Sequence, residues 1–210
     1  MKDLIFDFDG TLVDTGEGIM NCVRLTFQHY GVPVPSEDEL RTFVGPPLAK
    51  TFPQYGIPVE KAEEAVGYFR VNYADFGKDQ CHPYAGIAEA LAELKAAGYR
   101  LHVGTSKPEH FARLLLERFD LMGYFDCVVG ATTDGTREKK IDVLKCLLNK
   151  IDTRDVLMIG DTRYDVEGAR ELGIDTLGVS WGYESEQSLL QHGAVATVAT
   201  PIEMIKYLTE

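Results

Sequence analysis

Short apolar runs alternate with helix-like patterns along most of the chain. The runs span residues 4–8, 99–106, 125–131, 155–162 and 175–181, and a weaker one spans 194–199. From Gly86 onward, each run except the last is followed by a segment whose apolar residues have helical spacing. Apolar strands that alternate with helices are typical of a parallel sheet with crossover helices. The pattern therefore predicts an α/β fold built on a parallel sheet.

The stretch from about residue 16 to 83 breaks this alternation, because its apolar residues recur with helical spacing and no strand pattern is evident. Ser36–Glu39 reads SEDE, which fits a helix capping box, and GPPL at 45–48 places proline near the start of another helix. His82–Gly86 would return the chain to the sheet. We expect a sheet domain formed by 1–15 and 84–210, and an inserted helical domain formed by 16–83.

Composition narrows the classes of partner and the cellular setting. The formal net charge of −12 argues against binding to nucleic acid, and no apolar run has the roughly 20 residues that a membrane span needs. The four cysteines are dispersed without a C-x-x-C pair, and the chain begins without the plan of a signal peptide. We therefore expect a cytoplasmic protein that binds neither nucleic acid nor membranes. Any anionic substrate would need a cation at its binding site.

Two acidic residues follow the first apolar run, in the sequence LIFDFDGT. In an extended strand, Asp7 and Asp9 would share one side and Phe8 would face away. Two carboxylates about 4 Å apart repel by roughly 4 kcal/mol at an effective dielectric constant near 20, so a cation between them or a proton on one is required. A strand that runs out into a solvated acidic turn would give the same pattern, so these residues alone do not define a site.

A second acidic pair follows another buried run, in MIGDTRYDVEGA at 158–169. Asp161 ends the run, and Asp165 lies near the start of the next helix, where it would also suit a helix N-cap. If the two strands are neighbours, Asp161 points towards Asp7 and Asp9. Carboxylates that converge without a nearby histidine favour a hard cation, best Mg²⁺. The sequence therefore predicts a magnesium site at the ends of these strands.

Two further features would suit an anion beside this metal. Lys140 shares the inward helix face with Val143, whereas Lys139 is expected to be solvated. Lys140 would serve either as a charge-balancing ion pair or as a group that holds a carboxylate and a phosphate together. Thr105-Ser106 ends a strand, where hydroxyls and amide groups at the start of the next helix can bind an anion. Together these groups describe phosphoryl transfer, in which one carboxylate attacks phosphorus and a second acid moves the proton.

Four segments, in this order, resemble the four motifs of the haloacid dehalogenase superfamily of phosphohydrolases: DFDGTLVDT, TSKP, the inward Lys140 and GDTRYDVEGA. GPPL and the segment WGYESEQSL at 181–189 are similar to segments of its phosphoglycolate phosphatase-like branch. The resemblance covers nearly the whole chain. It implies a Rossmann-like parallel sheet with flanking helices and an all-helical cap domain inserted after the first motif.

The resemblance also implies roles for individual residues. Asp7 would be the nucleophile and a Mg²⁺ ligand, and Asp9 would be the general acid and base, its main-chain carbonyl also binding Mg²⁺. Asp161 would bind Mg²⁺, with Asp165 supporting it through water or directly. Lys140 would bridge the nucleophile and the phosphate. The implied phosphate-binding residues are Thr105 or Ser106, together with Gly10.

The sequence departs from the family pattern in two places: Lys140 is followed by Ile141 rather than by proline, and Glu184 stands where the branch commonly has glycine. We expect a Mg²⁺-dependent phosphatase that hydrolyses a small-metabolite phosphate monoester of the phosphoglycolate type, as a monomer or weak homodimer. The alternatives are a 5′-nucleotidase or pyrophosphatase, a β-phosphoglucomutase-like sugar phosphomutase, and a phospho-acceptor module without turnover. Arg41 and Lys50 flank GPPL and would either meet a substrate carboxylate or be solvated surface cations.

Overall fold

The computed structural model describes residues 3–153 and 155–210 and falls into two compact units. The core unit comprises the chain up to Val13 together with Pro83–Glu210, and the helical unit comprises Asp14–His82. Both described ends of the chain belong to the core unit, so the helical unit is an insertion into it. Among the described residues, no helix combines the length and the apolar character that crossing a membrane requires.

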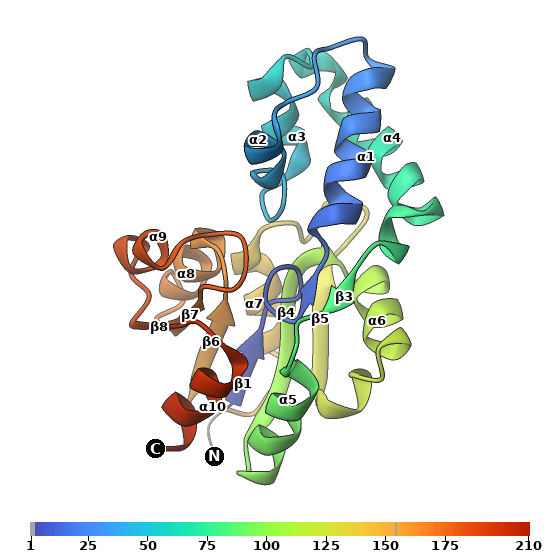
Figure 1. Cartoon of the computed structure of the whole chain (residues 1–210). Coiled ribbons are helices and arrows are strands. Elements are labelled where there is room, and N and C mark those ends of the chain that lie inside the picture. The colour runs from blue at the N-terminus through green and yellow to red at the C-terminus, as the bar shows by residue number, and fades with distance from the viewer. Residues whose placement is uncertain (1–2, 154) are drawn as a thin grey trace. The chain divides into compact units, whose positions relative to one another are not determined.

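Six parallel strands form the sheet of the core unit, which confirms the predicted α/β fold (Figure 1). Their order across the sheet is β5-β4-β1-β6-β7-β8, and each neighbouring pair is parallel. The strands are β1 (Asp3–Phe6), β4 (Arg100–Pro108), β5 (Cys127–Ala131), β6 (Val156–Gly160), β7 (Asp175–Val179) and β8 (Ala196–Val198). Because β1 lies between β4 and β6, the carboxyl ends of these three strands meet at one edge of the sheet.

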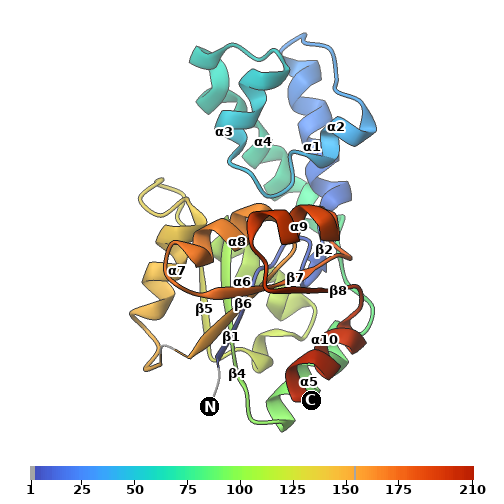
Figure 2. The ribbon, with the colours of Figure 1, turned by 90° about the vertical axis from the view of Figure 1, so that its left-hand side faces the viewer.

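Helices cover both faces of this sheet (Figures 1 and 2). One face carries α7 (Lys140–Leu148), α8 (Arg163–Arg170) and α9 (Glu186–His192); the other carries α5 (Ile87–Ala96) and α6 (Glu109–Arg118), with α10 (Pro201–Thr209) packed against α5. A 3₁₀ turn at Met122–Tyr124 precedes β5. The sequence pattern showed no helical spacing after the last strand, but α10 follows it. Only Met204 of α10 is buried, so periodicity is weak there, and the N-cap Thr200 with Pro201 is the signal that remains.

The strands read as nearly continuous apolar runs because both faces of the sheet are covered. All four residues of β1 are buried. Ile5 of β1 and Met158 of β6 pack with Val143 and Leu144 of α7 in one apolar cluster. A Cβ added at Gly104 would lie 2.8 Å from Ile5 Cγ2, so a larger residue there would displace this packing. Each fully buried side chain of this size stabilises the fold by roughly 1.5–3 kcal/mol. The packed strands therefore hold the residues at their carboxyl ends in fixed positions.

The helical unit has an interior of its own. It contains α1 (Gly16–His29), α2 (Glu37–Arg41), α3 (Leu48–Thr51) and α4 (Ala62–Asp75), with 3₁₀ turns at Phe52–Tyr55, Val59–Lys61 and Gly77–Asp79. The predicted capping box is present, because the Glu39 amide donates to Ser36 Oγ and the Glu39 carboxylate accepts the Ser36 N–H. Phe27 contacts Phe43 and Phe52 edge to face, with ring centroids 5.7 and 5.8 Å apart. Such aromatic pairs add stability beyond the area that they bury.

Two very short strands, β2 (Val13–Asp14) and β3 (His82–Pro83), pair in a separate two-stranded sheet. They occupy the places where the chain leaves the core unit and where it returns. The sequence pattern predicted no strand between residues 16 and 83, so β3 corrects that expectation. Two residues are too few for an alternation of apolar and polar positions to show.

Candidate active site

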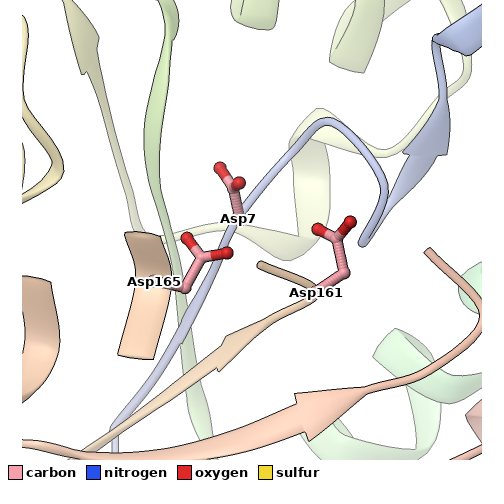
Figure 3. A group of neighbouring side chains, drawn as sticks. All are labelled: Asp7, Asp161 and Asp165. Carbon is pink, nitrogen blue, oxygen red and sulfur yellow. The ribbon is translucent and has the colours of Figure 1, made fainter. Parts of the chain in front are cut away.

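Three buried acids meet at the carboxyl edge of the sheet (Figure 3). Asp7 directly follows β1, Asp161 directly follows β6, and Asp165 lies in the first turn of α8. The pairing of β1 with β6 continues past the strand end, because the Asp7 N–H donates to Ile159 O at 2.9 Å. Each acid offers one carboxylate oxygen, and these oxygens all lie within 4.8 Å of one another. The sheet thus brings Asp7 together with two acids that lie more than 150 positions further along the chain.

Glycines make room for this acid cluster, which we define as Asp7, Asp161 and Asp165. A Cβ added at Gly160 would lie 2.4 Å from Asp165 Cγ, and one added at Gly182 would lie 2.3 Å from Asp161 Oδ2. Any side chain at these positions would therefore collide with a carboxylate of the cluster.

Lys140 is the cation of the acid cluster. Its Nζ lies 2.8 Å from Asp7 Oδ1 and 2.8 Å from Asp165 Oδ1, and it donates a hydrogen bond to Gly104 O at 2.9 Å. Burial disfavours its charged form, but Asp165 and Asp7 outweigh that effect and raise the pKa of Lys140. Lys139 is exposed at the N-cap of the same helix. One lysine of the pair therefore faces the acids, and the other faces solvent.

The acid cluster carries more negative charge than Lys140 balances. Three ionised carboxylates and one ammonium leave a net charge of −2 (−3 + 1). Burial, with the neighbouring charges of Asp165 and Asp7, raises the pKa of Asp161 well above its usual value. Burial and Asp7 also raise the pKa of Asp165 to about 6, against the opposing effect of Lys140. The site is therefore short of positive charge.

A divalent cation fits this deficit in charge and in chemistry. Carboxylate oxygens are the ligands that Mg²⁺ prefers, and the cluster contains neither histidine nor cysteine. Mg²⁺ binds oxygen at about 2.0–2.1 Å, so two ligands on opposite sides of the ion lie about 4.2 Å apart. The oxygens of the acid cluster lie within 4.8 Å of one another, which is the appropriate scale.

Asp161 and Asp165 are held by hydrogen bonds as well as by charge. Thr11 Oγ1 donates to Asp161 Oδ1 at 2.9 Å, and the Tyr183 amide donates to Asp161 Oδ2 at 2.9 Å. The Asp165 carboxylate accepts from the N–H and the hydroxyl of Thr162, at 3.0 and 2.9 Å. Thr162 rather than Asp165 is the N-cap of α8, and Asp165 at N3 belongs to the capping box and to the acid cluster at the same time.

Asp9 is not one of the three acids of the cluster and pairs with a different lysine. Lys107 Nζ donates to Asp9 Oδ1 at 2.9 Å. β1 ends at Phe6, so Asp7 and Asp9 follow the strand instead of lying within it, and the extended strand on which their expected shared side depended is absent at these two residues. The next residues form a turn in which Phe8 O accepts the Leu12 and Val13 amides. Beyond the strand end, the alternation of side-chain directions no longer applies.

The predicted phosphate-binding residues have different settings. Thr105 is 1% exposed and its hydroxyl accepts the Lys107 N–H at 3.1 Å, whereas Ser106 is half-buried. The Gly10 amide donates to Val13 O at 2.9 Å, so it is engaged within its own turn. Gly10 has a φ of +78°, and an added Cβ would lie 2.1 Å from Asp161 Oδ2. Glycine is therefore required there by backbone conformation and by the approach of Asp161.

Three participants were missed in the sequence. Lys107 lies inside the TSKP motif but carries no apolar neighbours in a helical pattern, which was the signal that selected Lys140. Thr11 follows the acidic pair directly, and a hydroxyl beside a predicted metal site could have marked it. The Tyr183 amide is a backbone group, so no side-chain pattern reveals it. Arg41 and Lys50 both lie exposed in the helical unit.

A family model described as haloacid dehalogenase-like hydrolase matches residues 4–179, a span that includes the acid cluster and both buried lysines. The chain belongs to the haloacid dehalogenase-like hydrolases. Proteins that are similar to the chain carry different functional names. They include 5′-nucleotidase, pyrophosphatase and phosphoglycolate phosphatase, as well as tyrosine-protein kinase.

Three similar proteins show the extent of the family relationship. Tyrosine-protein kinase PtkA of Mycobacterium tuberculosis is 42% identical over 182 residues, which cover 86% of this chain and 62% of that protein. A 5′-nucleotidase of Pseudomonas aeruginosa is 36% identical over 193 residues, covering 90% and 87%. The crystal structure of a predicted phosphatase from Clostridium acetobutylicum has a TM-score of 0.93 at 36% identity, covering 99% and 97%. The chain thus spans less than two thirds of the length of the mycobacterial kinase.

Proposed function

We propose that this chain is a Mg²⁺-dependent phosphatase that hydrolyses a small phosphate monoester through an aspartyl phosphate on Asp7. The supporting observation is the setting of Asp7, whose Oδ1 lies 2.8 Å from Lys140 Nζ inside a buried cluster with two further acids. A carboxylate held beside a cation is a suitable nucleophile for phosphorus.

Each chemical step is assigned to a residue of the core unit. An oxygen of Asp7 forms a bond to phosphorus while the bond from phosphorus to the ester oxygen breaks. Asp9, in its acid form, gives its proton to that leaving oxygen. As a carboxylate, Asp9 then takes a proton from water, whose oxygen bonds to phosphorus while the bond to Asp7 breaks. Free phosphate leaves, and both acids return to their starting states.

The remaining groups neutralise and hold the phosphoryl oxygens. Lys140 contacts Asp7 directly and supplies a positive charge next to the reacting carboxylate. Thr105 would hold a phosphoryl oxygen through its hydroxyl, which is fixed by the Lys107 amide at 3.1 Å. Mg²⁺, held by Asp7, Asp161 and Asp165, would neutralise charge on the transferred group.

The helical unit is proposed to be the cap domain that selects the substrate. Its two sequence candidates, Arg41 and Lys50, are exposed and carry the charge that a phosphoglycolate-type carboxylate requires. The similarity to a 5′-nucleotidase supports nucleoside monophosphates as the competing substrate class. Of the two domains expected from the sequence, the one formed by 1–15 and 84–210 would carry out the chemistry, and the one formed by 16–83 would select the substrate.

A panel of phosphate compounds tests this proposal. Phosphoglycolate, nucleoside monophosphates, pyrophosphate and a sugar 1-phosphate are each incubated with the protein and Mg²⁺, and free phosphate is measured. Hydrolysis of one ester far above the others identifies the substrate class. An isomerised sugar phosphate without phosphate release would favour the mutase alternative. The proposal would be contradicted if no compound released phosphate and none left a phosphoryl group on the protein.

A second candidate is transfer of the phosphoryl group from Asp7 to a tyrosine hydroxyl rather than to water. The 42% identity to a protein named tyrosine-protein kinase supports it. It needs a nucleoside triphosphate as donor and the same Asp7 as relay. Incubation with labelled ATP and a tyrosine-containing polymer separates the two candidates, because only the kinase reaction labels the polymer.

A further inference from the structure

Asp9 is paired with a buried lysine that the proposed reaction does not otherwise use. Lys107 Nζ lies 2.9 Å from Asp9 Oδ1, and the two side chains are 3% and 15% exposed. Asp7 is paired with Lys140 instead, so the two acids of the DFD sequence have separate cations from separate elements. Burial of an ammonium is costly unless a partner compensates it. The buried Lys107 ammonium therefore depends on Asp9 as its partner more than an exposed lysine would depend on a surface carboxylate.

The position of Lys107 is fixed from several sides. Its amide donates to Thr105 Oγ1 at 3.1 Å, at the irregular end of β4. A Cβ added at Gly130 would lie 2.7 Å from Lys107 O, so strand β5 packs directly against this main chain. The ammonium lies 5.5 Å from the centroid of the Phe8 ring, within the range of a cation–π contact. The strands thus determine where the ammonium meets Asp9.

We propose that Lys107 is a positioning residue that holds the Asp9 carboxylate in the orientation needed for proton transfer. The inference rests on the proposed function. Asp9 must reach the leaving ester oxygen in one step and the attacking water in the next. Asp9 itself lies in a turn beyond the end of β1, and Lys107 is a charged partner that reaches it from another strand. A displacement of about 1 Å in such a group can slow a reaction roughly hundredfold.

A positioning role and a purely structural role predict different results. If Lys107 acts through Asp9, its removal costs nothing further once the Asp9 carboxylate is gone. If Lys107 only stabilises the fold, its effect on the rate is the same with and without that carboxylate. Non-additive effects between neighbouring residues are the measure of such coupling.

The experiment uses the full chain with Mg²⁺ and p-nitrophenyl phosphate. The variants are Lys107→Met, Asp9→Asn, the double variant, and Lys139→Met as the matched control, since Lys139 is exposed. Steady-state rates give kcat and KM, and acid quenching gives the amount of phosphorylated protein. We expect Lys107→Met to lower kcat roughly ten- to hundredfold and to let phosphorylated protein accumulate. KM should fall together with kcat, because slow breakdown of the phosphorylated protein leaves kcat/KM nearly unchanged. The double variant should lie within about twofold of Asp9→Asn.

A second variant covers the case in which Lys107→Met does not fold, as judged by its circular dichroism and thermal unfolding. Lys107→Arg keeps the positive charge and should have a kcat between those of the wild type and an uncharged variant. Its effect should also vanish when Asp9 is replaced by asparagine. Equal slowing by either Lys107 variant in both backgrounds, or no slowing at all, would overturn the positioning role.

Failure of the inference can be told apart from failure of the proposed function. If the wild-type protein neither releases phosphate nor becomes phosphorylated on Asp7, the proposed phosphatase reaction fails. If the wild type is active and Asp7→Asn is inactive, but the effects of Lys107 and Asp9 are additive, only the role of Lys107 is overturned.

Discussion

Thr11 donates a hydrogen bond to Asp161, a residue 150 positions further along the chain. The bond joins the turn after β1 to the end of β6 and aims the Asp161 carboxylate into the acid cluster. Its partner atom on Thr11 is a hydroxyl, which can either donate or accept. The acid can therefore be replaced by an amide without loss of hydrogen bonds, and this permits a clean test of its charge.

Asp161→Asn should stabilise the metal-free protein and weaken its response to Mg²⁺. The amide nitrogen can donate to Thr11 Oγ1 while the amide oxygen accepts the Tyr183 N–H, so the geometry is retained and a buried charge is removed. We expect a gain of about 1–3 kcal/mol in unfolding free energy with EDTA at neutral pH. Thermal unfolding with and without Mg²⁺ measures both effects. Glu93→Gln, which changes an exposed helix position, is the control and should leave both unchanged.

The metal-free protein should lose stability as the pH rises. Folding raises the pKa of Asp161 and raises that of Asp165 to about 6, whereas an unfolded aspartate titrates near about 3.9. The folded state then binds protons more tightly, so this stabilisation is complete below the unfolded pKa and is lost through the folded pKa. Urea unfolding in EDTA from pH 4 to 7.5 should show a decrease of the order of a few kcal/mol, and Asp161→Asn should reduce the slope. Equal slopes for both proteins would contradict this origin.

Asp7→Asn should abolish turnover and leave the fold intact. The amide keeps the shape of the side chain but removes the nucleophile, so activity should fall at least about hundredfold, or about 2.7 kcal/mol in barrier. Phosphate release measures the loss, and mass spectrometry of the purified variant excludes deamidation back to aspartate. If a sample free of deamidation kept more than about a hundredth of the wild-type activity, Asp7 would be ruled out as the nucleophile.

Lys140→Met should cost far more activity than Lys139→Met. Lys140 Nζ lies 2.8 Å from oxygens of both Asp7 and Asp165, whereas Lys139 is exposed. Removal of one partner from a buried ion pair typically destabilises a protein by about 3–5 kcal/mol, so Lys140→Met should also lower the melting temperature. Parallel measurements of kcat and of thermal unfolding compare the two variants. The opposite ranking would mean that the wrong lysine was assigned to the site.

Ca²⁺ should inhibit the reaction in competition with Mg²⁺. Asp7 is proposed to use one carboxylate oxygen for the metal and the other for attack. Ca²⁺ accepts six to eight ligands at about 2.3–2.6 Å and often takes both oxygens of a carboxylate, whereas Mg²⁺ prefers a tight octahedron. Phosphate release during a titration of Ca²⁺ against fixed Mg²⁺ tests this, and excess Mg²⁺ should restore the rate. Equal rates with either ion alone would exclude the double role of Asp7.

Much of the fold could be predicted because it depends on regular periodicity. Buried parallel strands give apolar runs, and the amphipathic helices between them give a different spacing, so the sheet was evident in the sequence. The last helix, with only Met204 buried, and the two-residue strand at His82–Pro83 lack that periodicity. These elements depend on caps and on single backbone pairs, which leave weak marks in a sequence.

The acids of the site could be predicted from the sequence, but the residues that contact them could be predicted only in part. Asp7 and Asp161 stand at the ends of apolar runs, Asp165 follows in the first turn of the next helix, and strand order brings these ends together. The pairing of Asp9 with Lys107 was not evident from the sequence, because the strand ends at Phe6 and a turn follows it. Lys107 was missed for the same reason, because it can be recognised as a partner only once the position of Asp9 is known.

The hydrogen bond from the Tyr183 amide to Asp161 Oδ2 makes a single backbone group sensitive to the charge of the metal site. An amide exchanges its hydrogen with solvent only when its hydrogen bond opens, and a charged acceptor holds the amide more strongly than a neutral one. Protonation of Asp161 should therefore speed exchange at residue 183, and retention of its charge should slow it. The loop after β7 thus carries a natural isotope-exchange reporter of the ionisation of an acid that is itself fully buried.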